Sequence, residues 1–172
     1  MAEYAIIEMK YERLDGIMKK QCNVSLNENF SITHSLKELK QIAKKNGIHL
    51  RRRNGFFGAY TFCLDNIFGL SDLWIEVSSI FGKITGFKVY RNADGYRYDL
   101  ITVYESYDEI NEHLIDVYGT PHFSAGSHDN NDTICEWYVD GITIRHYIFE
   151  RFAVADYLVF DFNNTIIKKT KA

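Results

Sequence analysis

Two stretches of the chain combine the periodicity of an amphipathic helix with residues that cap helix ends. In the first stretch the apolar positions recur at helical spacing, at Leu36, Leu39, Ile42 and Ala43. Ser35 and Glu38 precede them as a capping box, and Asn46-Gly47 follows them as a C-terminal cap. This pattern predicts a helix of about a dozen residues that begins at Ser35 and ends at Asn46-Gly47.

The second stretch also has capping residues at both ends. Ser106 and Glu109 form a capping box. The apolar positions behind it are Ile110, Leu114 and Val117. Gly119 provides a C-terminal cap and Pro121 blocks continuation, so the spacing predicts a helix that begins after Ser106.

The N-terminal segment also has apolar residues at helical spacing, at Tyr4, Ile7, Tyr11, Leu14 and Met18. We therefore predict a helical segment within residues 3–20, although Gly16 weakens it by about 1 kcal/mol relative to alanine. Residues 24–32 follow as a candidate short strand.

The remaining apolar segments alternate with a period of two, as strands do. We predict strands over residues 56–64, 73–79, 84–91 and 98–105, and again over 134–140, 142–149 and 157–162. Asp140-Gly141 between two of them indicates a tight hairpin, and Ala93-Asp94-Gly95 indicates a turn.

Helices followed by strands joined by short turns predict an α+β fold, mainly antiparallel sheet with helices layered on one side. The order of elements suggests two tandem helix-plus-strands units over residues 33–105 and 106–162. Because no Gly-, Pro- or Ser-rich linker interrupts the chain, we predict a single domain over residues 1–172. A doubly wound α/β fold is excluded, since consecutive strands lack crossover helices.

The composition is that of a globular protein with much sheet. The 172 residues include 12 Tyr, 12 Phe and 2 Trp but a single Pro, which favours strands. With 46% hydrophobic and 25% charged residues, the chain is not a disordered protein, a collagen or a coiled coil. No apolar run is long enough for a transmembrane helix.

The cysteines and the start of the chain indicate a cytoplasmic protein. Cys22, Cys63 and Cys135 are odd in number and form no CxxC pair, so we interpret them as reduced thiols. The first residues have neither a cationic region nor an unbroken apolar core, so they do not form a secretory signal.

The net charge of −3 hides a strong division along the chain. Residues 34–53 carry seven basic residues and one acidic residue, and Arg51, Arg52 and Arg53 form a basic patch. Residues 92–162 carry fourteen acidic residues and three basic ones. A field of that sign steers a basic partner and repels nucleic acid. The basic patch could contact phosphates, but no nucleic-acid recognition motif accompanies it.

Strand alternation places aromatic and charged residues on faces opposite the apolar ones. We predict that these residues bind a protein partner: Trp74, Tyr90, Glu136, Tyr138, Asp140, Tyr147 and Tyr157. Aromatic rings mixed with charges are typical of protein-binding surfaces. The alternative is that this face is covered by the helices or by the N-terminal segment.

The chain resembles small bacterial inhibitor modules of the beta-lactamase-inhibitor-protein type. The resemblance rests on the tandem order of helix and strands, on the step Tyr118-Gly119-Thr120-Pro121 at the end of a helix, and on Trp137 in a following strand. It implies an aromatic, charged sheet surface that clasps an enzyme. Those inhibitors are secreted, whereas this chain has no such signal and no disulfide pattern, so a cytosolic version would be similar to an immunity protein.

Motifs for other chemistry are missing from the sequence. The glycines of residues 55–60 lack the Lys-Ser/Thr of a phosphate-binding loop, and there is no GxSxG or HExxH motif. The residues His122, His128, Asp129 and Asp132 fit a polar turn better than a metal site. His146 and Cys135 fit packed core residues better than a catalytic pair.

We therefore expect a non-enzymatic protein-binding module, an immunity or inhibitor protein with no cofactor and no metal. The alternative is an enzyme or small-ligand-binding domain with a pocket between sheet and helices.

Overall fold

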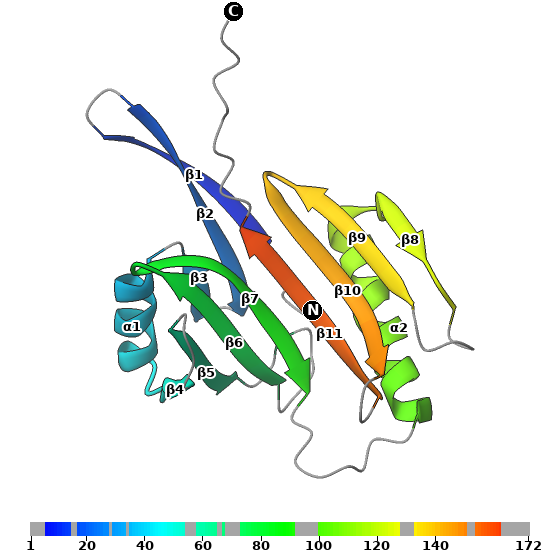
Figure 1. Cartoon of the computed structure of the whole chain (residues 1–172). Coiled ribbons are helices and arrows are strands. Elements are labelled where there is room, and N and C mark those ends of the chain that lie inside the picture. Colours follow the sequence, from blue (N-terminus) through cyan, green and yellow to red (C-terminus); the bar gives the residue numbers. More distant parts are fainter. Residues whose placement is uncertain are drawn as a thin grey trace, which may run out of the picture.

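The computed structural model describes residues 6–14, 17–27, 29–33, 35–53, 58–64, 67, 73–91, 100–127, 133–150 and 154–162 (Figure 1). These residues form two helices, a sheet of three strands and a sheet of eight strands. Neither described helix has the length and apolar character needed to cross a membrane.

The eight-stranded main sheet is antiparallel throughout. Its strands are β4 (Arg51–Arg53), β5 (Ala59–Leu64), β6 (Leu73–Ile80), β7 (Lys83–Arg91), β8 (Phe123–Ala125), β9 (Ile134–Val139), β10 (Ile142–Glu150) and β11 (Val154–Phe162). The spatial order is β4-β5-β6-β7-β11-β10-β9-β8, so the central pair joins strands that are distant in sequence. The prediction of an α+β fold with an antiparallel sheet is confirmed.

The N-terminal segment forms strands, so the prediction of a helical segment over residues 3–20 is wrong. β1 (Ile6–Leu14), β2 (Ile17–Asn27) and β3 (Phe30–Thr33) make the small antiparallel sheet. Leu14 pairs with Ile17, which leaves only Asp15-Gly16 between the paired strands. Asp-Gly is a strong signal for a two-residue hairpin, and it outweighs apolar spacing that also fits a helix.

Helix α1 (Leu36–Lys45) has the predicted caps. The backbone N–H of Glu38 donates to Ser35 Oγ at 3.3 Å, and Gly47 beyond the helix has a φ of 69°. The backbone N–H of Leu36 donates to the carbonyl of Gly82 at 3.0 Å. This bond fastens the start of α1 to the turn between β6 and β7.

Helix α2 (Leu100–Tyr118) begins earlier than predicted, so the predicted strand over residues 98–105 is wrong. Ser106 lies inside the helix, where its hydroxyl donates to Asp156 Oδ2 of β11 at 3.1 Å. Val103 and Tyr107, one turn apart, are buried against Ile148 of β10. This packing favours helix in a segment whose sequence also alternates like a strand, and the boundary predicted between residues 105 and 106 falls inside α2.

One face of the main sheet forms the core together with β2, β3, α1 and α2. Phe87 of β7 stacks on Phe160 of β11 with ring centroids 4.5 Å apart. Trp137 of β9 is fully buried, and its Nε1–H donates to the carbonyl of Gly119 at 2.8 Å. The end of α2 is thereby held to the sheet.

His146 of β10 lies in the buried contact between α2 and the sheet. Its ring stacks on Tyr107 at 4.1 Å between centroids, and its Nδ1 lies 3.4 Å from Asn111 Oδ1. Its Nε2 has no hydrogen-bond partner among the described residues. Burial lowers the pKa of His146 to about 3, so the folded chain keeps a neutral imidazole at ordinary pH.

This burial predicts a loss of stability in acid. An unfolded histidine titrates near pH 6.5, so between about pH 6.5 and pH 3 the unfolded chain binds a proton at His146 that the folded chain does not. The free energy of unfolding therefore falls as the pH drops through this range, by up to about 1.4 kcal/mol per pH unit from this residue.

Urea unfolding of the wild type and of His146→Gln across this pH range measures the effect. Glutamine does not titrate, so the variant should lose stability less steeply with falling pH. If the free energy of unfolding fell equally steeply with pH in the two proteins, His146 would not be the cause of the loss of stability. Asp156, whose pKa burial raises, is present in both proteins and cancels from the comparison.

Candidate protein-binding face

The side of the main sheet opposite the core carries partly exposed side chains, and we call it the open face. In Figure 1, α2 lies behind β9 and β10, so the open face is turned toward the viewer. The alternation predicted from sequence is confirmed on five strands by the burial of the opposite side chains. The residues of the open face used below are Trp74, Glu76, Lys88, Tyr90, Phe123, Glu136, Tyr138, Arg145, Tyr147, Phe149, Tyr157, Val159 and Asp161.

A row of four aromatic residues crosses the middle of the open face. Strand register pairs Trp74 of β6 with Tyr90 of β7, Tyr90 with Tyr157 of β11, and Tyr157 with Tyr147 of β10. The ring centroids are 6.2 Å apart for Tyr90 and Tyr157 and 5.7 Å apart for Tyr147 and Tyr157. Burial raises the pKa of Tyr90 and of Tyr147, so these phenols stay neutral and present apolar rings with a polar tip.

A second row, one pleat away, is charged. Lys88 Nζ lies 3.9 Å from Glu76 Oε1 and 5.2 Å from the ring centroids of both Tyr90 and Tyr157. A cation over two ring faces is held by their quadrupoles as well as by the carboxylate. The charged row thus fixes the orientation of the aromatic row.

Arg145 continues the charged row toward the sheet edge. Its Nε lies 2.6 Å from Glu136 Oε1, and its Nη1 lies 3.3 Å from Asp161 Oδ2. The hydroxyl of Tyr138 donates to Glu136 Oε2 at 2.7 Å. The hydrogen bond from Tyr138, followed by that from Arg145, holds the pKa of Glu136 below its usual range.

The basic patch meets the aromatic row. Arg51 and Arg53, which share one side of β4, reach toward β6: the Arg51 guanidinium carbon lies 5.9 Å from the Trp74 ring centroid, and Arg53 forms an ion pair with Glu76. Arg52 is exposed and lies between them in the strand. Sequence reasoning treated the basic patch and the aromatic face as separate surfaces, and the structure joins two of its three arginines to that face.

The described acidic residues of the C-terminal half are not gathered on one surface. Glu136 and Asp161 lie on the open face, where Arg145 pairs with both. Asp140 occupies the exposed hairpin turn after β9 with a φ of 50°, away from the aromatic row. The largest group of exposed carboxylates lies on α2, across the sheet from the open face: Glu105, Asp108, Glu109, Glu112 and Asp116.

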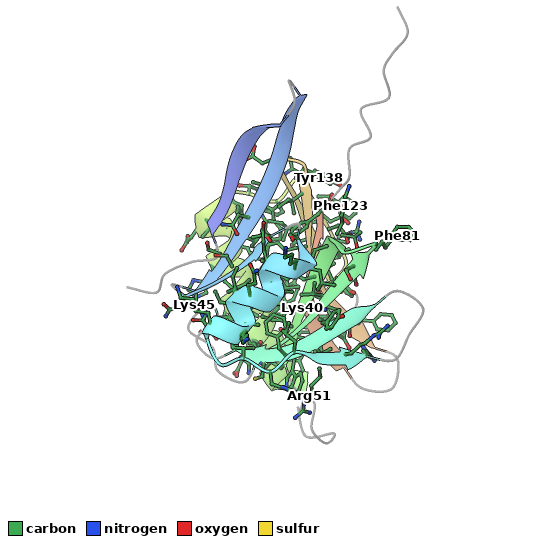
Figure 2. All side chains as sticks on the ribbon, turned by 90° about the vertical axis from the view of Figure 1, so that its left-hand side faces the viewer. Lys40, Lys45, Arg51, Phe81, Phe123 and Tyr138 are labelled. Carbon is green, nitrogen blue, oxygen red and sulfur yellow. The ribbon has the colours of Figure 1, made fainter. Side chains whose placement is uncertain are left out.

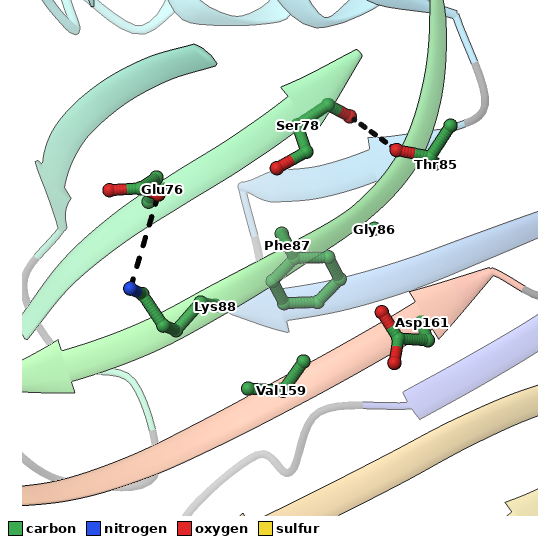
Figure 3. A pocket seen from close by; sticks show the side chains of 8 residues that line it. All are labelled: Glu76, Ser78, Thr85, Gly86, Phe87, Lys88, Val159 and Asp161. Carbon is green, nitrogen blue, oxygen red and sulfur yellow. Dashed lines mark hydrogen bonds and ion pairs between the residues drawn. The ribbon is translucent and has the colours of Figure 1, made fainter. Parts of the chain in front are cut away.

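A shallow depression of about 330 Å³ lies in the open face beside the charged row (Figure 3). Its residues are Glu76, Ser78, Thr85, Gly86, Phe87, Lys88, Val159 and Asp161. Gly86 lies at its floor, where a Cβ would come within 2.5 Å of the carbonyl oxygen of Phe160. The absence of a side chain there both permits the close approach of β7 to β11 and leaves the hollow.

Other exposed aromatic residues lie outside the row, and sequence reasoning missed two of them. Phe123 on β8 and Phe81 in the turn between β6 and β7 are exposed, like Tyr138 and Phe149. Phe81 is fully exposed and has a φ of 50°, in a two-residue turn that glycine or asparagine usually occupies. The signal was present in the sequence: two alternating strands separated by Phe81-Gly82 place a large apolar residue where a turn residue belongs.

Figure 2 places these features around the molecule. The view looks onto α1, with Lys40 and Lys45 on the helix and Arg51 below it, while Phe81 projects at the margin. The positive φ at Phe81, a bulky residue, costs stability.

Of the remaining chemical candidates, Cys135 and His146 are direct partners in the register of β9 and β10, and both are buried. His122 is exposed and its Nδ1 accepts a hydrogen bond from the backbone N–H of Tyr138 at 3.3 Å, whereas His128, Asp129 and Asp132 lie outside the described residues. The described part of the chain contains no group of three His, Cys, Asp or Glu side chains placed to hold a metal. The turn predicted at residues 93–95 also lies outside the described residues.

Comparisons of the chain with protein-family models, with curated proteins and with solved structures found no match. The site is therefore defined by its geometry alone.

The strain at Phe81 predicts a variant that is more stable than the wild type. Asparagine adopts positive φ more readily than phenylalanine, so Phe81→Asn should raise the free energy of unfolding by about 0.5–1 kcal/mol. Thermal and urea unfolding measure the change. Phe81→Ala is the control, because it removes the exposed ring but retains the strain; an equal gain in both variants would show that the backbone conformation is not the cause.

Proposed function

We propose that this chain is a non-enzymatic protein-binding module of the inhibitor or immunity kind, which docks its partner on the open face. The observation that carries the proposal is the aromatic row, four partly exposed rings in register on four adjacent strands. A rigid sheet holds these rings in place before the partner arrives, so docking orders few side chains.

The surroundings of the row have the anatomy of an interface. Tyrosine and tryptophan are the residues that most often dominate binding energy when a partner buries them. The charged side chains beside them are already paired within the face, which lowers the cost of covering them. Phe123, Tyr138 and Phe149 are further exposed aromatic residues of the open face.

The charge of the open face bears on the choice of partner. Its three carboxylates, on Glu76, Glu136 and Asp161, are matched by Lys88 and Arg145 and by the two arginines that reach it from β4. Since four cations face three carboxylates, the face does not favour the basic partner expected from the acidic residues of 92–162. We propose recognition by ring burial, with charge setting orientation.

The order of elements supports the likeness to inhibitor modules. α1 with β4 to β7 and α2 with β8 to β11 repeat one pattern, and the last strand of each set meets the other at the centre of the sheet. We propose that these are two tandem units whose helices cover one side and leave the other for a partner. The contact between Trp137 and Gly119 joins the two motifs on which the likeness rests.

The alternative, an enzyme or small-ligand-binding domain, needs a pocket between sheet and helices. The depression at Gly86 lies on the open face, and a second one lies beside α1. Neither supports the alternative.

The test is capture of a partner with matched baits. Tyr147→Ala combined with Tyr157→Ala removes two adjacent rings of the row, while Ile115→Ala removes an exposed apolar side chain on α2 as a control. Proteins from the source cells that bind the wild type and the control should bind the double variant at least about tenfold more weakly, as expected when contacts worth about 1.4 kcal/mol or more are lost.

Hydrogen exchange on the captured complex provides a second readout. Partner binding should slow exchange near β7, β10 and β11, with α2 unaffected. A partner retained equally by the double variant, with the variant's circular dichroism unchanged, would remove the aromatic row from the binding site.

A further inference from the structure

A groove beside α1 combines an apolar floor with a rim of lysines. Its volume is about 500 Å³, and it is lined by Leu36, Lys37, Lys40, Gln41, Lys44 and Gly82. The three lysines are exposed and occur about one helical turn apart, a spacing of about 5.4 Å along the axis. The groove is separate from the open face and plays no part in the function proposed above.

α2 presents the opposite charge at the same spacing. Glu105, Glu109, Glu112 and Asp116 are exposed along one side of the helix at successive turns, and residues 100–118 contain no lysine or arginine. Ile115 lies on the same exposed side and is 40% exposed. The helix therefore offers carboxylates for a lysine rim together with an apolar side chain for a groove floor.

We propose that the groove beside α1 binds α2 of a second copy of this chain. Two helices laid side by side would set Glu112 and Asp116 opposite Lys40 and Lys44, with Ile115 against the apolar stems of the lysines between these two levels. Charge complementarity and matching one-turn spacing select this occupant. A phosphate backbone or a lipid headgroup satisfies the lysines but does not explain the apolar floor.

The contact is heterologous, since different surfaces of the two copies meet. It closes as a dimer if the partner's own groove receives α2 in return, and otherwise continues as a chain of copies. Because its ion pairs are at the surface, it should be weak and sensitive to salt. Sedimentation of the full chain at about 0.01 M ionic strength should show species heavier than the monomer, and these should dissociate at about 1 M, where the Debye length falls to about 3 Å.

Matched charge reversals test the geometry. Lys44 lines the groove and its neighbour Lys45 does not, although both are exposed on α1. Lys44→Glu should raise the dissociation constant of the assembly about tenfold, and Lys45→Glu should change it much less, because Lys45 does not line the groove. Both variants alter the net charge equally, so Lys45→Glu controls for net charge. Equal effects of the two variants would overturn the proposal.

Reciprocal reversals provide the decisive measurement. Lys40→Glu with Lys44→Glu, and separately Glu112→Lys with Asp116→Lys, should each give a monomer at low salt, and mixing the two variants should restore the assembly. A wild type that stays monomeric at low salt overturns the proposal, as does assembly that ignores these reversals. A monomer whose α1 instead binds duplex DNA or anionic vesicles assigns the lysines to that ligand.

Discussion

The pairing of β7 with β11 is the contact on which the rest of the structure depends. It joins strands about seventy positions apart in the chain and unites β4–β7 with β8–β11 in one sheet. Gly86 allows the two backbones to approach, and Phe87 stacks on Phe160 beneath them. On the other side of the same two strands, Tyr90 meets Tyr157. Core and aromatic row therefore depend on the same register, and a slip of one residue would exchange them.

The two rows of the open face support each other. Rings alternate with charges from one pleat to the next, and Lys88 belongs to both rows because it lies over two tyrosine rings while facing Glu76. Arg145 links Glu136 and Asp161 across three strands. Such a surface is rigid before binding, which distinguishes it from one assembled on loops.

The sequence pattern correctly predicted the features that depend on neighbouring residues in the chain. Alternation predicted which side chains of β6, β7, β9, β10 and β11 are buried, and Ser35 with Glu38 predicted the start of α1. It failed at α2, where a tertiary contact decides: Ser106 looks like a cap but bonds Asp156 inside the helix. In the N-terminal segment the prediction followed the helical spacing of apolar residues and neglected the local hairpin signal Asp15-Gly16. Each residue predicted for the aromatic row could be placed on a face from the sequence. The sequence could not show that these residues form one row, because strand order and register are set by contacts distant in sequence.

The edges of the main sheet have a consequence for the behaviour of the chain at high concentration. β4 and β8 are only three residues long, and β4 consists entirely of arginines. Two short borders offer a neighbouring molecule few backbone groups to pair with, and the arginines of β4 also repel an identical border. A wide sheet with one uncovered face would otherwise invite fibrous growth by strand addition, and these two borders oppose it.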